Sequence, residues 1–309
     1  METRRIGELE VSLAGLGTNN FGRRMDSSRT RDVVEAALSE GVTHFDTAEA
    51  YADGRSEEYL SRALGRRRDD VVIASKFGYV PPRNASGGQA AWVPRALEAS
   101  LRRLGTDHID LYYYHKPDPS TPIADTLELM NRFLEQGKVR EVACSNFTAE
   151  QLDEAARAAN ERGLRPFAAV QNELSLLERE PERNGVLAAC ERHGMAFVPY
   201  YPLASGLLTG KYRRGKPAPS GRLGGDGRRR AEEILPADQL NVVEQLATFA
   251  EVRGHTLLDL AMSWLASRPH VATVIAGATS PEQVRANVAA LTAWPLSVPD
   301  VSELGRQAA

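Results

Sequence analysis

Four side chains that could act together in proton transfer stand at the ends of three successive apolar runs. The run Thr43–Phe45 leads into Asp46 and then, after a short connection, Tyr51. The next two runs end in Lys76 and His115. If these runs are neighbouring parallel strands, their carboxyl ends meet at one rim, where a carboxylate, a phenol, an ammonium group and an imidazole converge.

Such a group of side chains could deliver a proton to a carbonyl oxygen. A free phenol has a pKa near ~10 and donates protons poorly at neutral pH. An ammonium group beside Tyr51 would make the phenol a better acid, and Asp46 would keep a buried Lys76 charged. A second donor from His115 would favour negative charge on the same oxygen, as the addition of hydride to an aldehyde or ketone requires. Taken singly, each of the four could be an ordinary rim, turn or packing residue.

The elements that must position these residues form a repeated unit of strand, loop, helix and glycine. Nearly all-apolar strands separated by amphipathic helices are typical of a parallel sheet covered on both faces. Eight of them predict an α/β fold, a closed (β/α)8 TIM barrel, as a single domain over residues 1–309. The predicted strands are Leu13–Gly17, Thr43–Asp46, Val71–Lys76, Ile109–His115, Val139–Ser145, Ala168–Gln171, Ala196–Tyr200 and Ala272–Ala276.

Additions to the eightfold repeat are also visible in the sequence. Residues 4–12 predict a short N-terminal β-hairpin that turns at Gly7. The long interval between strands seven and eight predicts an extra helix and a Gly/Pro/Arg-rich loop, residues 210–230, expected to cover the rim. Capping-box patterns at Thr148–Gln151 and Ser280–Gln283 mark the starts of two helices.

A doubly wound dinucleotide-binding fold is the alternative to the barrel, suggested by Gly15 and Gly17. The third glycine of that fingerprint is missing, and residues 19–22 do not begin a helix, so the barrel is favoured.

Composition narrows the function classes. A formal net charge of −3 gives no basis for binding nucleic acid. No apolar run approaches the roughly 18–20 residues of a membrane span, and the N-terminus lacks the apolar segment of a signal peptide. Cys144 and Cys190 show no metal or redox spacing. We therefore expect a cytoplasmic protein without a bound metal, with a small molecule as its partner.

The chain resembles the aldo-keto reductase superfamily over almost its whole length, in particular the bacterial branch that is similar to potassium-channel β subunits and sugar dehydrogenases. The resemblance implies that Tyr51 is the general acid/base, that Lys76 and Asp46 tune it, and that His115 orients the carbonyl. The segments that carry it are HFDTAEAY (44–51), VVIASKFG (71–78), IDLYYYH (109–115), VACSNF (142–147), VQNELSLL (170–177), PYYPLASGLLTGKY (199–212) and VIAGATSPEQVRAN (274–287).

The resemblance also implies a cofactor, NADPH or less often NADH, bound in an extended form without a Rossmann motif. Ser145, Asn146 and Gln171 match residues that hold the nicotinamide amide, and Tyr200 matches the aromatic residue that stacks on its ring. The pyrophosphate loop is matched by Pro202, Leu203, Ala204, Gly206, Leu207 and Lys211. The adenosine end is matched by Gly277, Thr279, Gln283 and Asn287, and further cofactor contacts are expected from Gly17, Thr18, Asn19 and Asp46.

One position departs from the pattern of relatives that prefer NADP. Many of them carry arginine or lysine where this chain has Thr279, which offers a hydroxyl but no charge. Arg222 in the long loop is the first candidate to compensate, and Arg285 is a weaker one. NADPH is the expected cofactor, with NADH as the alternative.

The sequence says least about the substrate. Candidate contacts just beyond strand ends are Phe21, Phe77, Trp92, Lys116 and Phe147, each of which could equally be a packing residue. Aromatic and amide groups suit a sugar, a sugar lactol or a small ketone.

Two alternatives to a reductase remain. Potassium-channel β subunits share this fold and bind NADPH with little turnover, although they depart from histidine at the position of His115. A metal-dependent hydrolase would need histidines and carboxylates clustered at strand ends, whereas the histidines here are scattered. The direction of the reaction and the oligomeric state stay open.

Overall fold

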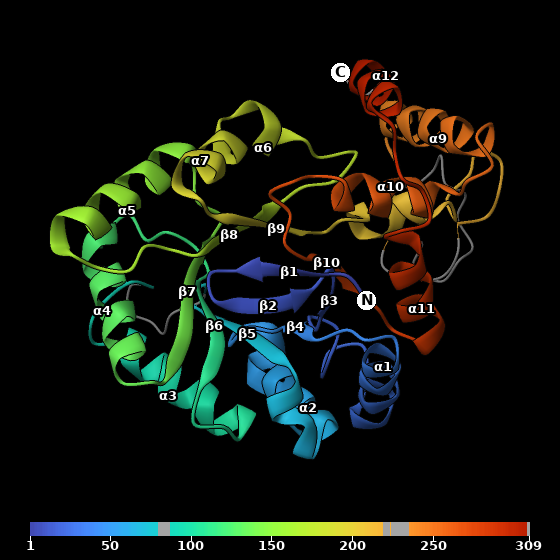
Figure 1. Cartoon of the computed structure of the whole chain (residues 1–309). Helices are drawn as coiled ribbons and strands as arrows, with labels where there is room; N and C mark the ends of the chain where they lie inside the picture. Colours follow the sequence, from blue (N-terminus) through green and yellow to red (C-terminus); the bar gives the residue numbers. More distant parts are fainter. Residues whose placement is uncertain (80–86, 219–222, 224–234, 308–309) are drawn as a thin grey trace.

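The computed structural model describes residues 1–79, 87–218, 223 and 235–307. In this part of the chain eight parallel strands form a barrel and helices surround it (Figure 1). The prediction of a TIM barrel is confirmed, with strand ends within two residues of the predicted ones. The strands are β3 (Ala14–Gly17), β4 (His44–Asp46), β5 (Val72–Phe77), β6 (Ile109–Tyr114), β7 (Val139–Ser145), β8 (Ala169–Glu173), β9 (Ala196–Tyr200) and β10 (Val274–Gly277).

The ring of strands closes through the backbone beside β9. The sheet order runs from β10 through β3 to β9, each neighbouring pair being parallel. Between its two ends, the Phe197 amide donates to the His270 carbonyl at 2.7 Å, and the Ala272 amide donates to the Phe197 carbonyl at 3.1 Å. All strand carboxyl ends therefore face one rim.

Helices follow the strands around the barrel. Among the described residues, α9 and α10 both lie between β9 and β10, so the predicted extra helix is confirmed. The predicted loop at 210–230 falls partly outside the described residues. The helices are α1 (Ser27–Ser39), α2 (Arg55–Leu64), α3 (Val93–Leu104), α4 (Ile123–Glu135), α5 (Ala149–Arg162), α6 (Glu180–Arg183), α7 (Val186–His193), α9 (Ala237–Glu251), α10 (Leu257–Ala266), α11 (Pro281–Ala290) and α12 (Val298–Gln307), with 3-10 turns η1 (Tyr51–Gly54), η2 (Gly65–Asp70) and η3 (Ala204–Thr209).

The two predicted capping boxes differ in the structure. Thr148 and Gln151 form the complete reciprocal pair at the start of α5. At α11 the Ser280 side chain accepts from the Gln283 amide, but the Gln283 side chain accepts from the Thr279 amide and not from that of Ser280. Only half of the second predicted box is therefore present.

The N-terminal hairpin, β1 (Thr3–Ile6) and β2 (Leu9–Ser12), closes the amino end of the barrel. Figure 1 shows it across the barrel centre. Ile6 and Leu9 are buried against the inward side chains of the strands, which include the small residues Ala74 and Ala143. Arg4 fixes the hairpin by donating to backbone carbonyls at and beyond the end of α10. With this end plugged, the opposite rim is the open end of the barrel.

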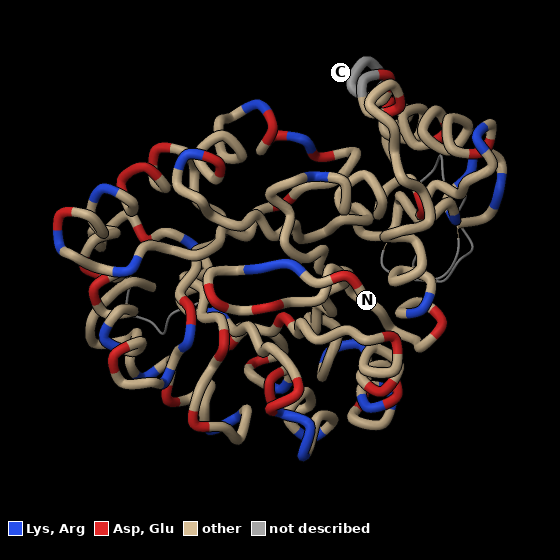
Figure 2. The backbone as a smooth tube through the Cα atoms, viewed as in Figure 1, with Lys and Arg blue, Asp and Glu red and all other residues tan. Residues whose placement is uncertain are grey.

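Acidic and basic residues alternate along the outer helices and loops (Figure 2). No helix among the described residues combines the length and the apolar character needed to cross a membrane.

Candidate active site

Asp46 and Lys76 form a buried ion pair at the carboxyl ends of β4 and β5. Lys76 Nζ lies 2.5 Å from Asp46 Oδ2 and donates to the Thr47 carbonyl at 2.8 Å. The second carboxylate oxygen, Oδ1, accepts from Gln171 Nε2 at 2.9 Å. Burial lowers the pKa of Lys76 and the Asp46 carboxylate opposes that shift. The pair therefore holds the ammonium group in one place at the rim.

Tyr51 lies beside this pair, at the first position of η1. Its hydroxyl is 3.4 Å from Lys76 Nζ, which also lies 5.0 Å from the centre of the phenol ring. The following residues Ala52 and Asp53 have positive φ values of 51° and 58°, so a strained turn presents the phenol.

Burial, followed by the Asp46 carboxylate, raises the pKa of Tyr51 well above its usual value. The sequence predicts that Lys76 lowers the pKa of Tyr51, and on this point the structure differs. Burial is the largest cause of the raised pKa, because a phenolate with little access to water loses its solvation. Tyr51 is therefore fully protonated at neutral pH.

His115 completes the group at the end of β6. Its ring meets the Tyr51 ring edge-on, with the centroids 6.0 Å apart. Burial, and then the charge of Lys76, lowers the pKa of His115 to about 2. The imidazole is thus neutral at physiological pH and carries a single N–H. The structure brings together all four residues that the sequence singled out.

The residues matched to the nicotinamide pocket form a connected hydrogen-bond network beside His115. Tyr200 donates to Asn146 Oδ1 at 2.9 Å, and Asn146 Nδ2 donates to the His115 carbonyl at 2.9 Å. Ser145 Oγ donates to the Gln171 carbonyl at 2.7 Å. Asn146 has a φ of 62°, a conformation that asparagine tolerates better than most residues. Gln171 contacts the catalytic candidates directly through Asp46.

The loop after β9 makes a left-handed turn beside Lys211. Ala204, Ser205 and Gly206 have consecutive positive φ values of 45°, 58° and 100°. A Cβ placed on Gly206 would lie 3.1 Å from Lys211 Nζ, so the glycine leaves room directly beneath an ammonium group. Burial lowers the pKa of Lys211. Of the other matched residues, Pro202 and Leu207 are buried and Leu203 is half-buried.

The residues matched to the adenosine end lie on α11 and on the segment just before it. Gly277 ends β10 and is exposed, and Asn287 lies farther along α11. The Thr279 amide and hydroxyl both donate to Gln283 Oε1, at 2.8 and 3.1 Å. Arg285 Nε lies 3.7 Å from Glu40 Oε1. Arg222 lies outside the described residues.

The loop after β3 is held against β4. Thr18, fully buried, bonds to the Asp46 carbonyl through its amide and its hydroxyl. Gly17 is buried as well, while Asn19 is half-buried. Of these predicted cofactor residues, Asn19 therefore has the most exposed surface.

Most of the predicted substrate contacts lie in the core. Phe21, Phe77 and Phe147 are buried, and Phe77 stacks between Tyr112 and Tyr114 on the outer side of the strands. These three rings offer no surface to a substrate because neighbouring strands and helices cover them. Trp92 is half-buried and Lys116 is exposed.

Two exposed aromatic residues at the rim are not among those predicted from the sequence. Tyr79 is 54% exposed, and its ring packs on the His115 ring with the centroids 4.8 Å apart. Tyr201 is 41% exposed and stands edge-on to Tyr200. Both contribute to raising the pKa of Tyr51, so both lie near it. Their position just after a strand end was the only available signal.

Glu49 is a third missed residue, and it links two rim loops. Its Oε1 accepts from the Gly78 amide at 2.7 Å. Burial, partly offset by that hydrogen bond, raises the pKa of Glu49 to about 7 from 4.5, with Glu57 raising it and Arg103 lowering it by smaller amounts. The carboxyl therefore titrates near neutral pH.

Replacing Glu49 should flatten part of the pH dependence of stability. Between pH 4.5 and about 7 the folded protein binds this proton more tightly than the unfolded chain does, so the free energy of unfolding should fall as the pH rises through that range. Glu49→Gln keeps an oxygen acceptor for Gly78 and should remove this fall, as urea midpoints at pH 5 and pH 8 would show. The exposed control Glu10→Gln should behave like the wild type. If the urea midpoint of Glu49→Gln still fell between pH 5 and pH 8 as much as that of the wild type, Glu49 would not be the group that titrates.

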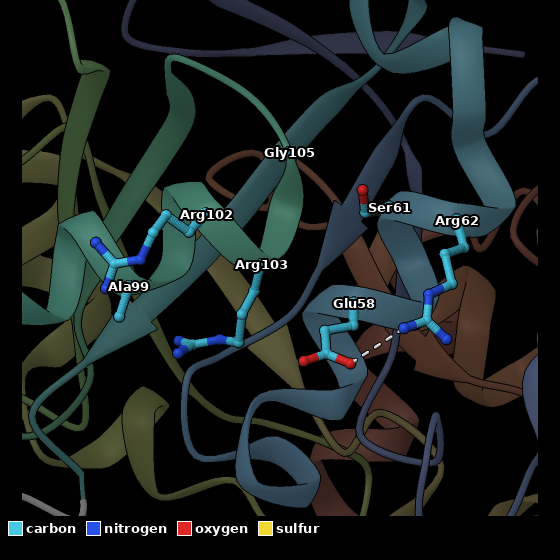
Figure 3. A pocket seen from close by; sticks show the side chains of 7 residues that line it. All are labelled: Glu58, Ser61, Arg62, Ala99, Arg102, Arg103 and Gly105. Atoms are coloured by element: carbon cyan, nitrogen blue, oxygen red, sulfur yellow. Dashed lines mark hydrogen bonds and ion pairs between the residues drawn. The ribbon is translucent and has the colours of Figure 1, made fainter.

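A groove of about 430 Å³ between α2 and α3 is not part of this site (Figure 3). Its arginines, Arg62, Arg102 and Arg103, stand in the last turns of these two helices. Positive side chains complement the negative end of a helix dipole there. Arg103 also pairs with the buried Glu57. The arginines of this groove therefore have a structural explanation.

Comparisons with known proteins agree with this arrangement. The chain matches the aldo/keto reductase family over residues 14–306. It is 35% identical to a probable voltage-gated potassium channel subunit beta of Arabidopsis thaliana, over 97% of this chain and 94% of that one. It is 30% identical to L-glyceraldehyde 3-phosphate reductase of Escherichia coli K12, over 100% and 93%. The structure of a glycerol dehydrogenase from Gluconobacter oxydans superposes with a TM-score of 0.83 at 28% identity, over 99% and 94%.

Proposed function

The chain belongs to the aldo/keto reductase family and is an oxidoreductase, and from this premise we propose that it reduces an aldehyde or ketone with NADPH, or oxidises a sugar or alcohol in reverse. The observation that carries the proposal is the position of Lys76, which contacts both Asp46 and Tyr51 at the rim. A buried ion pair beside a phenol is an arrangement for proton transfer.

Each of the four rim residues has one task in the proposed reaction. A bound nicotinamide cofactor would supply a hydride for the carbonyl carbon. The Tyr51 hydroxyl donates its proton to the carbonyl oxygen, which completes the alcohol. The Lys76 ammonium group stabilises the phenolate that remains, and Asp46 fixes the ammonium group. Neutral His115 donates its single N–H to the same oxygen and so orients the carbonyl.

The residues around the rim fit a dinucleotide. The turn at Gly206, beside Lys211, suits a pyrophosphate because it offers space and a positive charge. The half-buried Tyr200 ring next to Asn146 suits the nicotinamide. The start of α11 presents a helix dipole to a phosphate at the adenosine end.

The substrate is proposed to lie between Tyr79 and Tyr201, with its carbonyl toward Tyr51. Exposed aromatic rings pack well against the C–H face of a sugar or against a small apolar ketone. Two similar proteins are named for glycerol and for a phosphorylated glyceraldehyde. A small hydroxylated carbonyl compound is therefore the favoured class of substrate.

Fluorescence titration with NADPH and with NADH is the first test. We expect micromolar binding of NADPH, and weaker binding of NADH because it lacks the 2′-phosphate. If neither dinucleotide binds, the reductase proposal fails regardless of the rim geometry.

A regulatory subunit that binds NADPH with little turnover is the second candidate, favoured by the potassium channel subunits among the similar proteins. Turnover distinguishes the two. NADPH oxidation with a panel of small aldehydes, ketones and sugars supports the enzyme, whereas tight binding without oxidation of NADPH by any of them supports the regulatory subunit.

A further inference from the structure

The adenosine end of the proposed site has no charge of its own at Thr279. NADPH differs from NADH by a 2′-phosphate, and a protein that prefers NADPH must compensate that negative charge. The Thr279 hydroxyl and amide are neutral donors, and both are bonded to Gln283. A cation must therefore come from another residue, if the cofactor is the one proposed above.

Arg285, on α11 itself, points away from this place. Its nearest acidic partner is Glu40, which caps the C-terminal end of α1. In a β/α barrel the helix starts lie at the rim and the helix ends lie at the opposite face. An interaction with Glu40 therefore draws Arg285 toward the face opposite to Thr279.

Arg29 lies where the charge is needed. It belongs to the first turn of α1, which packs beside α11 (Figure 1). Its Nη2 lies 3.4 Å from the Thr279 carbonyl oxygen. In the described part of the chain no carboxylate forms an ion pair with the Arg29 guanidinium, although Asp26 accepts from the Arg29 backbone amide. The side chain is exposed, so most of its N–H donors face solvent.

We propose that Arg29 binds the 2′-phosphate of NADPH and sets the preference of this protein for NADPH over NADH. A guanidinium presents paired N–H donors that match two phosphate oxygens. The contact with the Thr279 carbonyl holds the guanidinium at the start of α11. The positive end of the α11 helix dipole also attracts the phosphate. Arg29 is thus a specificity-determining residue supplied by a helix at the other end of the chain.

The test compares dissociation constants in Arg29→Met and in the wild type. The ligands are NADPH, NADH, 2′,5′-ADP and 5′-ADP, so binding is measured without turnover. Loss of a pair of charge-assisted hydrogen bonds should raise the dissociation constants of NADPH and 2′,5′-ADP by about tenfold or more. The dissociation constants of NADH and 5′-ADP should stay nearly the same. Arg31→Met, which removes an exposed charge from the same helix, is the matched control and should change none of the four.

A rescue variant separates charge from structure. Arg29→Met/Thr279→Arg should regain the binding of NADPH, because it restores a guanidinium at the same phosphate. If Arg29→Met bound NADPH and NADH equally more weakly than the wild type does, Arg29 would have a structural role and the inference would be overturned. A wild-type preference for NADH would overturn it as well. If the wild type binds NADPH and Arg29→Met binds it equally well, only this inference falls. If the wild type binds neither dinucleotide, the reductase proposal falls with it.

Discussion

Replacing Tyr51 by phenylalanine should lower kcat by about 10²–10⁴-fold, the usual contribution of a positioned general acid. The hydroxyl delivers its proton only in the transition state, so the dissociation constant of NADPH should stay nearly the same. Phenylalanine keeps the ring that packs against His115, and the rim should therefore remain folded.

Single-turnover oxidation of NADPH and a binding titration together check this expectation. Tyr59→Phe is a suitable control, because it removes the same hydroxyl from a half-buried tyrosine on α2, outside the rim. Loss of NADPH binding in Tyr51→Phe would show a structural role for the phenol, and unchanged turnover would remove it from the mechanism.

Lys76→Met should lower the free energy of unfolding and should also abolish turnover. Removing one partner of a buried ion pair leaves Asp46 as an uncompensated charge, which typically costs about 3–5 kcal/mol in the free energy of unfolding. Gln171 still donates to Asp46 but brings no charge. The loss should appear as a lower denaturant midpoint with an unchanged slope.

The double variant Asp46→Asn/Lys76→Met separates stability from chemistry. With both charges gone, much of the lost stability should return, since neither group is left unpaired. Turnover should stay absent because nothing stabilises the phenolate of Tyr51. A double variant as unstable as Lys76→Met alone would mean that the pair does not act as a unit.

The barrel could be predicted because each strand is a short apolar run followed by an amphipathic helix, and these local patterns agree with the global fold. The convergence of Asp46, Lys76 and His115 followed from a single rule about strand ends. The half-formed box at Ser280 could not be predicted, because its glutamine turns to a neighbouring amide of equal chemistry.

The predictions for individual site residues that were wrong have different physical causes. The sequence does show that Phe77 cannot face the substrate, because successive side chains in a strand point to opposite faces and Lys76 occupies the inner one. The raised pKa of Tyr51 could not be predicted, because burial depends on how distant loops pack around the phenol. Tyr201 is exposed and has a φ of 52°, a conformation that tyrosine gives no sequence signal for.

The first and last strands of the barrel are neighbours, and this has a consequence for biosynthesis. Strand β3 pairs with β10, and Arg4 bonds to a carbonyl 267 residues away. The N-terminal half emerges from the ribosome long before β10 and the carbonyl partner of Arg4 are synthesised. During that time the edge of β3 that will pair with β10 has no partner. The barrel closes only after β10 has emerged. Nascent chains therefore pass through an open sheet whose two edges must be kept apart from other chains until the end of synthesis.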